Sequence, residues 1–109
     1  GLQGYGITVT ARVPLEVLEA CPEIVGLCRR AAELGMEASA SDAGVGAAMA
    51  RAAALGAAMN VRINLQDMAD DPEAAAMLER VDRALTVTTQ AAAELEAEVW
   101  ASLGGGELP

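Results

Sequence analysis

The residues of this sequence best suited to chemistry lie on one alanine-rich stretch, residues 41–65. Asn60 and Asn64 are four positions apart, which places them on one face of a helix. Asparagine is unfavourable inside helices because its amide competes for backbone hydrogen bonds, so this pair indicates hydrogen bonding to a substrate or to another helix. Ser41 and Asp42 open the stretch, and both residue types are typical of helix caps.

The charge balance and the missing histidine exclude several classes of function. The chain carries 7 basic residues, all arginine, against 16 acidic ones, for a net charge of −9, so we expect no nucleic-acid partner. Without histidine, Ser-His and Cys-His nucleophile pairs, zinc sites of the HExxH type and di-iron Glu-x-x-His pairs are excluded, and no metal site is predicted.

The two cysteines predict packing and not chemistry. On one helix Cys21 and Cys28 are separated by about 10 Å of axial rise, which is too far for a disulfide. We interpret both as small apolar core residues, which fits a reducing cytoplasm, and no signal peptide is visible. Residues 43–61 are long enough to span a bilayer, but they are alanine-rich and carry Arg51 at their centre, so no membrane partner is expected.

The hydrophobic spacing predicts an all-α fold of long antiparallel helices, at about residues 14–34, 42–68 and 72–103. Pro14 suits a first helical turn, Pro22 should kink or divide that helix, and Asp71 precedes Pro72 as an acidic cap. Residues 1–13 are expected to form an irregular leader and residues 104–109 a flexible tail. The alternation in residues 61–65 would also suit a strand, but a lone strand has nothing to pair with.

A narrow stripe of mostly small residues follows one face of the middle helix. Its members, taken at 100° per residue from Asp42, are Gly46, Met49, Ala53, Gly56, Asn60, Asn64 and Asp67. Small side chains in the middle of the stripe would allow another helix to approach closely. Three rods of up to about 45 Å cannot bury all their apolar faces on each other. We therefore expect part of a helical bundle, completed by dimerisation or by a missing N-terminal half.

One segment resembles the cyclodeaminase/cyclohydrolase family, which comprises the folate-processing domain of formiminotransferase-cyclodeaminase and stand-alone bacterial methenyltetrahydrofolate cyclohydrolases. The segment reads SDAGVGAAMARAAALGAAMNVRINL over residues 41–65, preceded by VPLEV at residues 13–17. The resemblance covers about residues 12–103 and implies an all-helical fold. Family domains are considerably longer, with a Gly-Gly-Gly-Ser helix start in an N-terminal half, so this chain resembles the C-terminal half.

The resemblance implies an enzyme that closes formiminotetrahydrofolate to methenyltetrahydrofolate with loss of ammonia, or that hydrolyses the methenyl bridge to formyltetrahydrofolate. Both reactions pass through a tetrahedral carbon between two folate nitrogens and need proton transfer, without a metal or redox cofactor. Asp42 is then the candidate for proton transfer, and the amides of Asn60 and Asn64 would hold the pterin edge.

Substrate binding would fall to Ser41, Arg51 and Arg62. An acidic protein needs a local positive site for the anionic glutamate tail of folate, although Arg62 would equally suit a salt bridge or a solvated surface. The alternative function is a non-catalytic helical oligomerisation module that keeps the family scaffold, or a helix-hairpin partner of another protein.

The helix geometry constrains any such site. Asp42 and Asn60 lie about 27 Å apart along one helix, so one chain cannot place both around one small substrate. Antiparallel pairing of two copies along the small-residue stripe would set the Asp42 of one beside the asparagines of the other. We therefore expect a homodimer, or a higher homo-oligomer, with a composite site near each end.

Overall fold

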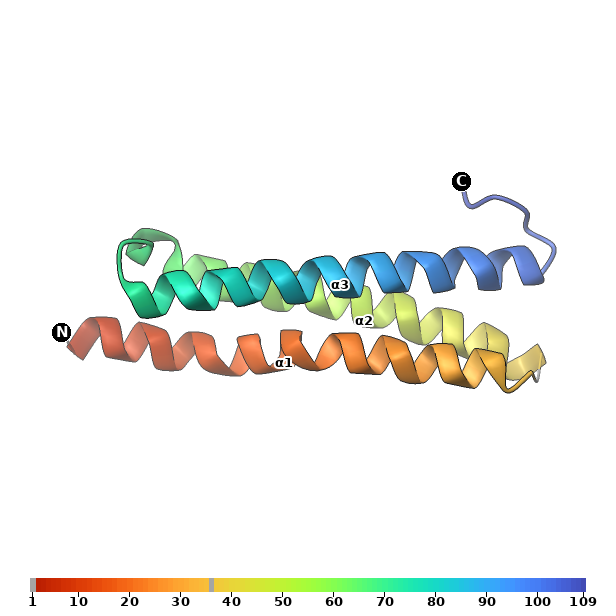
Figure 1. The fold of residues 1–109 in the computed structure, drawn as a ribbon, viewed down its shortest axis with the longest axis horizontal. Coiled ribbons are helices and arrows are strands. Elements are labelled where there is room, and N and C mark those ends of the chain that lie inside the picture. Colours follow the sequence, from red (N-terminus) through yellow and green to blue (C-terminus); the bar gives the residue numbers. More distant parts are fainter. Residues whose placement is uncertain (1, 36) are drawn as a thin grey trace.

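A computed structural model describes the backbone of residues 2–35 and 37–109 and the side chains of residues 9–35 and 39–109. Three long helices run up, down and up beside one another (Figure 1), which confirms the predicted all-α fold. The elements in chain order are α1 (Leu2–Glu33), α2 (Glu37–Leu65), the short 3₁₀ helix η1 (Gln66–Met68) and α3 (Pro72–Ser102).

The molecule is a rod of 55 × 24 × 15 Å with a radius of gyration of 16.6 Å. A compact domain of this length has a radius of about 13 Å. The predicted mismatch between helix length and a globular shape is therefore confirmed, and much of the helix surface stays outside a shared core.

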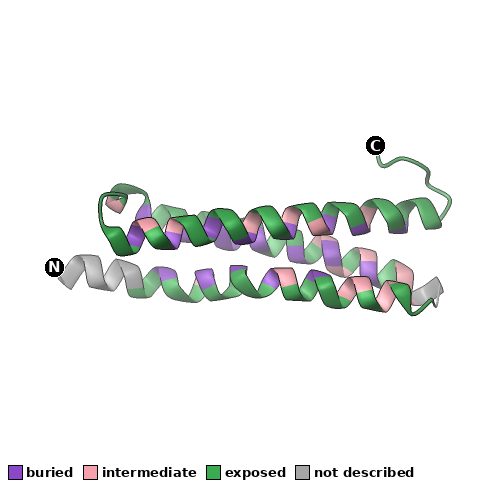
Figure 2. Cartoon of the chain, viewed as in Figure 1, coloured by how far each residue is buried: buried purple, intermediate pink, exposed green. Residues whose placement is uncertain are grey.

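The core is a narrow seam between the three helices, where the buried residues of Figure 2 face one another. On α1 the fully buried side chains include Leu15, Leu18 and Val25, and on α3 they include Val81 and Leu95. The inner face of α2 consists mainly of alanine: Ala43, Ala47, Ala50, Ala54, Ala57 and Ala58, followed by Val61 and Leu65. Alanine on one helix lets the other two helices approach closely while their larger side chains fill the seam.

The irregular leader predicted for residues 1–13 is wrong, because α1 already begins at Leu2. Ala11 is fully buried and lies four and seven positions before Leu15 and Leu18, so it extends their buried stripe by one turn. Pro14 therefore lies inside the helix and not in its first turn, and α1 also continues through Pro22 without being divided. Packing along the whole rod outweighs the local cost of proline.

The start predicted for the second helix is also wrong. Gly35 adopts φ +83°, a left-handed conformation that ends α1, and α2 begins almost directly afterwards at Glu37. Ser41 and Asp42 are thus interior helical residues and do not cap the helix. The helical interpretation of residues 61–65 is confirmed, since α2 continues to Leu65.

The predicted start of α3 is confirmed. The carboxylate of Asp71 accepts hydrogen bonds from the backbone N–H groups of Glu73 (2.8 Å) and Ala74 (3.1 Å), and Pro72 occupies the first turn. The apolar stripe of α3 is buried at Val81, Thr88, Ala92, Leu95 and Val99 and half-buried at Leu78 and Leu85.

Both cysteines are free thiols, as predicted, with Cys21 buried and Cys28 half-buried. Burial raises the pKa of the Cys21 thiol above its ordinary value, which keeps it protonated and unreactive at neutral pH. In the described part of the chain, no helix combines the length and apolar character that crossing a membrane requires. The described residues also contain no group of three or more Cys, Asp or Glu side chains arranged to hold a metal ion.

Candidate functional site

The candidate proton-transfer residue, Asp42, borders the groove between α1 and α2. Its neighbours there are Ile24, Leu27 and Cys28 of α1, and together they line a shallow depression of about 410 Å³. Asp42 itself is exposed. A carboxylate at the rim of an apolar depression can exchange a proton with a ligand seated in that depression.

Asn60 borders a second depression in the same groove, closer to the other end of α2. Its walls are Val13, Pro14 and Val17 from α1 with Ala53 and Gly56 from α2, and its volume is about 440 Å³. Asn60 is exposed. The amide is therefore available to hydrogen-bond a molecule that reaches the groove from outside.

Asn64 is committed in part to its own helix. Its Nδ2 donates to the backbone carbonyl of Asn60 at 2.8 Å, so one of its two amide protons is already hydrogen-bonded within the last turns of α2. The structure thus brings Asn60 and Asn64 together as predicted from their spacing, but through a side chain-to-backbone bond.

The small-residue stripe does not pack against a helix of this chain over most of its length. Met49 (67% exposed), Ala53 and Asn60 are exposed, and a Cβ added to Gly56 would meet nothing within 4 Å. At Gly46 the expected close approach exists, because an added Cβ would lie 2.8 Å from the Cys28 sulfur. Within one chain the helices meet instead through the alanine face, about 110° away around α2 at 100° per residue. The predicted contact of the stripe with a second copy stays a prediction.

The candidate arginines lie on the opposite flank of α2, against α3. Arg51 donates two hydrogen bonds to the Glu96 carboxylate, at 2.9 and 2.8 Å, and Arg62 donates to Asp82 at 2.7 Å. The hydrogen bonds that Arg51 donates to Glu96 raise the pKa of Arg51 further above its ordinary value. Both guanidinium groups therefore have an anionic partner, and a substrate carboxylate would have to compete with it.

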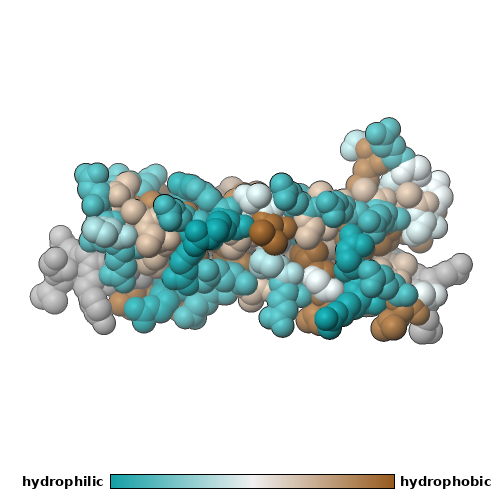
Figure 3. All heavy atoms as spheres, in the orientation of Figure 1, coloured by the Kyte–Doolittle hydropathy of each residue, from teal (hydrophilic) through white to brown (hydrophobic). Residues whose placement is uncertain are grey.

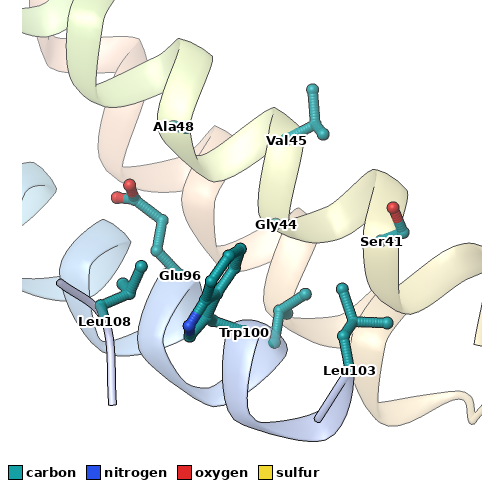
Figure 4. Close-up of a pocket in the computed structure, with 9 residues that line it drawn as sticks. Ser41, Gly44, Val45, Ala48, Glu96, Trp100, Leu103 and Leu108 are labelled. Atoms are coloured by element: carbon teal, nitrogen blue, oxygen red, sulfur yellow. The ribbon is translucent and has the colours of Figure 1, made fainter. Parts of the chain in front are cut away.

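Ser41 lies on the α3 flank as well. It lines a groove of about 310 Å³ between α2 and α3, together with Gly44, Glu96 and Trp100 (Figure 4). At Gly44 the helices are too close for a side chain, since an added Cβ would lie 2.9 Å from the Cγ1 of Val99.

Sequence reasoning missed Glu96, Trp100 and Leu108, which line this α2–α3 groove. A helical wheel of α3 alone shows Glu96 as one more surface acid, because its partner Arg51 is 45 positions away in the sequence. The single tryptophan of the chain was a usable signal, since an indole near a helix end usually marks a contact.

Five of the six predicted site residues thus divide into two sets on opposite flanks of α2. Asp42 and Asn60 face the α1 side, whereas Ser41, Arg51 and Arg62 face the α3 side. Within the first set, eighteen residues of helix still separate the two side chains by about 27 Å. One copy of the chain does not assemble these residues around one small molecule.

Comparison with known proteins gives one match. Residues 5–83 match a family model described as formiminotransferase-cyclodeaminase, and this range contains all the predicted site residues but not Glu96 or Trp100. No curated protein and no solved structure matches the chain.

Proposed function

This chain belongs to the formiminotransferase-cyclodeaminase family, whose description points to folate one-carbon metabolism in general, and from that premise we propose an enzymatic role in it. The reaction is closure of formiminotetrahydrofolate with loss of ammonia, or hydrolysis of the methenyl bridge. In either reaction the group that leaves or enters, ammonia or water, exchanges protons with a side chain beside the tetrahedral carbon.

The observation that carries the proposal is the position of Asp42 and Asn60 in one groove. Each borders its own depression along the α1–α2 seam, and the α2 surface between them is uncharged and mostly small: Met49, Ala53 and Gly56. A second copy lying antiparallel along this surface would bring the Asp42 of one chain beside the Asn60 and Asn64 of the other. A homodimer would then hold two equivalent composite sites.

Within such a site the roles follow from the side-chain chemistry. Asp42 transfers the proton, and Asn60 donates hydrogen bonds to the pterin edge and to developing negative charge. Asn64 orients the end of α2 through its bond to the Asn60 carbonyl and offers its remaining amide groups. The reaction needs no metal or redox cofactor in this scheme.

In this scheme Arg51 and Arg62 supply positive charge at a distance from Asp42 and Asn60. Their ion pairs lie on the flank that faces α3, so they would meet the glutamate tail of folate only where it passes over α2. Binding at Arg62 would exchange Asp82 for a substrate carboxylate, a near-neutral exchange at an exposed pair. The same exchange at Arg51 is less favourable, because it leaves Glu96, only 16% exposed, without its partner.

Mixing two inactive variants tests the composite site. We expect Asp42→Asn and Asn60→Ala each to abolish turnover by the full chain, measured as release of ammonia from formiminotetrahydrofolate or loss of the methenyl absorbance. When the two variants are mixed, half of the dimers are heterodimers and each regains one intact site, so about one quarter of the activity returns. Asp70→Asn and Gln90→Ala, an exposed acid and an exposed amide away from the groove, are the matched controls.

The alternative is the helical oligomerisation module, and a specific observation favours it: both candidate arginines are already ion-paired and Asn64 is tied to its own backbone. Concentration-dependent association without any folate binding supports the module. Folate binding by a strictly monomeric chain contradicts the composite site. Release of ammonia from formiminotetrahydrofolate, compared with loss of the methenyl absorbance, separates the two reactions.

A further inference from the structure

Residues 104–109 reverse direction after α3, and in Figure 1 they rise clear of the α3 ribbon before they run back along the rod. Leu103 ends the last turn of α3, with its N–H donating to the carbonyl of Val99 at 3.1 Å. The N–H of Gly104 then donates to Ala101 and that of Gly105 to Trp100, both at 3.0 Å. These bonds fix the direction in which the chain leaves the helix.

Each of the three positions in this turn requires glycine for its own steric reason. Gly104 (φ +86°) and Gly106 (φ +70°) occupy the left-handed region, which side chains disfavour. Gly105 lies flat on the indole of Trp100, because an added Cβ would be 2.4 Å from Nε1 and 2.5 Å from Cε2. The turn therefore uses the tryptophan as its support, and the flexible tail expected from the sequence has a defined path here.

The turn carries Leu108 back to the α2–α3 groove. Leu108 lines the groove beside Trp100 and also the neighbouring depression of about 400 Å³ that contains Arg51 and Leu55. Glu96, whose carboxylate pairs with Arg51, borders both depressions as well. In Figure 4 the Leu108 and Trp100 side chains stand on the same side of α3, toward α2.

The attachment is shallow compared with the helix packing. Leu108 remains 43% exposed and Trp100 40% exposed, and residues 101–109 are exposed throughout. The segment can therefore leave the groove at the cost of a few contacts, without unfolding a helix.

From these contacts we propose that residues 104–109 are a strap that reversibly closes the α2–α3 groove, with Leu108 covering it and the Gly105–Trp100 contact as its hinge. When the strap is displaced, the groove exposes the Trp100 indole and the apolar wall formed by Val45 and Ala48. The strap and Trp100 lie outside the matched residues 5–83 and on the flank of α2 away from Asp42 and Asn60. The strap is thus separate from Asp42 and Asn60, although its groove contains Ser41 and it borders Arg51. Its test reads tryptophan accessibility and not folate binding, so either proposal can fail without the other.

The single tryptophan reports directly on the strap. In the full chain, Gly105→Ala inserts a methyl group where the indole lies and Leu108→Ser removes the cover. For both variants we expect the tryptophan emission to move to longer wavelength and acrylamide quenching to rise roughly twofold, as local opening exposes the indole. The dye 8-anilinonaphthalene-1-sulfonate should bind with enhanced fluorescence, while far-ultraviolet circular dichroism stays at the wild-type value.

Two matched variants make the result specific. Gly26→Ala adds the same methyl group on α1, where nothing lies within 4 Å, and Pro109→Ser changes the exposed residue next to Leu108. Both controls should keep the wild-type emission and quenching. Wild-type emission in the Gly105→Ala and Leu108→Ser variants overturns the strap, as does a wild-type indole that is already as accessible to acrylamide as a free tryptophan amide.

Discussion

The α1–α2 seam and the two seams made by α3 expose different chemistry to solvent. All four ion pairs between described helices include a residue of α3: Arg29–Glu98, Glu19–Arg80, Arg51–Glu96 and Arg62–Asp82. The α1–α3 side of the molecule is accordingly largely hydrophilic in Figure 3. The α1–α2 seam is bordered by the exposed apolar residues Val13, Val17, Ile24 and Leu27 of α1 and Ala53 of α2, and Met49, Met59 and Ile63 are exposed elsewhere on α2. We call this set the uncharged face.

The difference shows that the outer side of α3 is charged, as expected for a helix that borders water, whereas the outer side of α2 is not. Helix α3 has one buried stripe and a charged outer side, the usual pattern for a helix that borders water. Residues 43–61 of α2 contain a single charge, Arg51, so the helix is apolar on its outer side as well. Contiguous exposed apolar surface of this kind is typical of an interaction site. The uncharged face is therefore the surface on which the proposed second copy would lie.

The largest expected effect comes from placing charge on the uncharged face. Met49→Lys combined with Met59→Lys should weaken self-association at least about 100-fold, or ~3 kcal/mol, because two ammonium groups per chain would lose water in the interface. Sedimentation velocity over a concentration series measures the change. Thr86→Lys with Val87→Lys, on the exposed side of α3, should leave association unchanged. A wild-type chain that stays monomeric throughout the series contradicts the dimer.

Two adjacent alanines on α2 test which of its faces is buried. Ala54 is fully buried in the alanine face, whereas Ala53 is exposed on the uncharged face. Ala54→Leu should overpack the seam and lower the free energy of unfolding by about 1–3 kcal/mol. Ala53→Leu, with the same change in volume and helix propensity, should change it by less than about 0.5 kcal/mol. Urea unfolding of dilute samples measures both values, and equal losses would contradict the assignment of the two faces.

Most of the fold could be predicted from local rules. The spacing of Leu18, Cys21 and Val25 on α1 and of Val81, Leu95 and Val99 on α3 identified the faces that are buried. The cap at Asp71 was readable because an acid followed by proline has few other interpretations. Helix α2 was the exception, because alanine and glycine on every side leave no hydrophobic stripe to read. Its inward face is decided by contact with α1 and α3.

Less of the candidate site could be predicted. Spacing identified Asn60 and Asn64 as neighbours, but the flank on which each side chain lies depends on the same undetermined rotation of α2. Arg62 was open to an ion-pair interpretation, yet its partner Asp82 is 20 positions away, and Glu96, the partner of Arg51, is 45 positions away. Pairs at that separation depend on the register of two helices, which the sequence does not encode locally. Leu108 was missed for the same reason.

Removing the cap of α3 should have an intermediate effect. Asp71→Ala leaves the N–H groups of Glu73 and Ala74 without their carboxylate acceptor, so the free energy of unfolding should fall by about 1 kcal/mol, within a range of roughly 0.5–2. Asp70→Ala removes the neighbouring acid and should cost less than about 0.5 kcal/mol. Thermal unfolding at several protein concentrations measures both. An equal effect of the two variants would show that charge near the helix start, and not the cap, stabilises α3.

The smallest effect concerns the ion pair that joins α1 to α3. Hydrogen bonding from Arg80 lowers the pKa of Glu19 below its ordinary value of 4.5 in the folded state. The pair therefore contributes fully above pH 4.5, and its contribution disappears as the pH falls through the lowered value, because the unfolded chain then binds the proton more readily. Both side chains are at least one-third exposed, so the contribution at neutral pH stays below about 1 kcal/mol.

Glu19→Gln should lower the unfolding free energy at pH 7 by that amount and match the wild type at pH 2, in urea titrations at both pH values. Glu23→Gln, an exposed acid on the same helix, is the control. If Glu19→Gln lowers the unfolding free energy by the same amount at pH 2, the packing of the Glu19 side chain, and not its charge, stabilises the contact between α1 and α3.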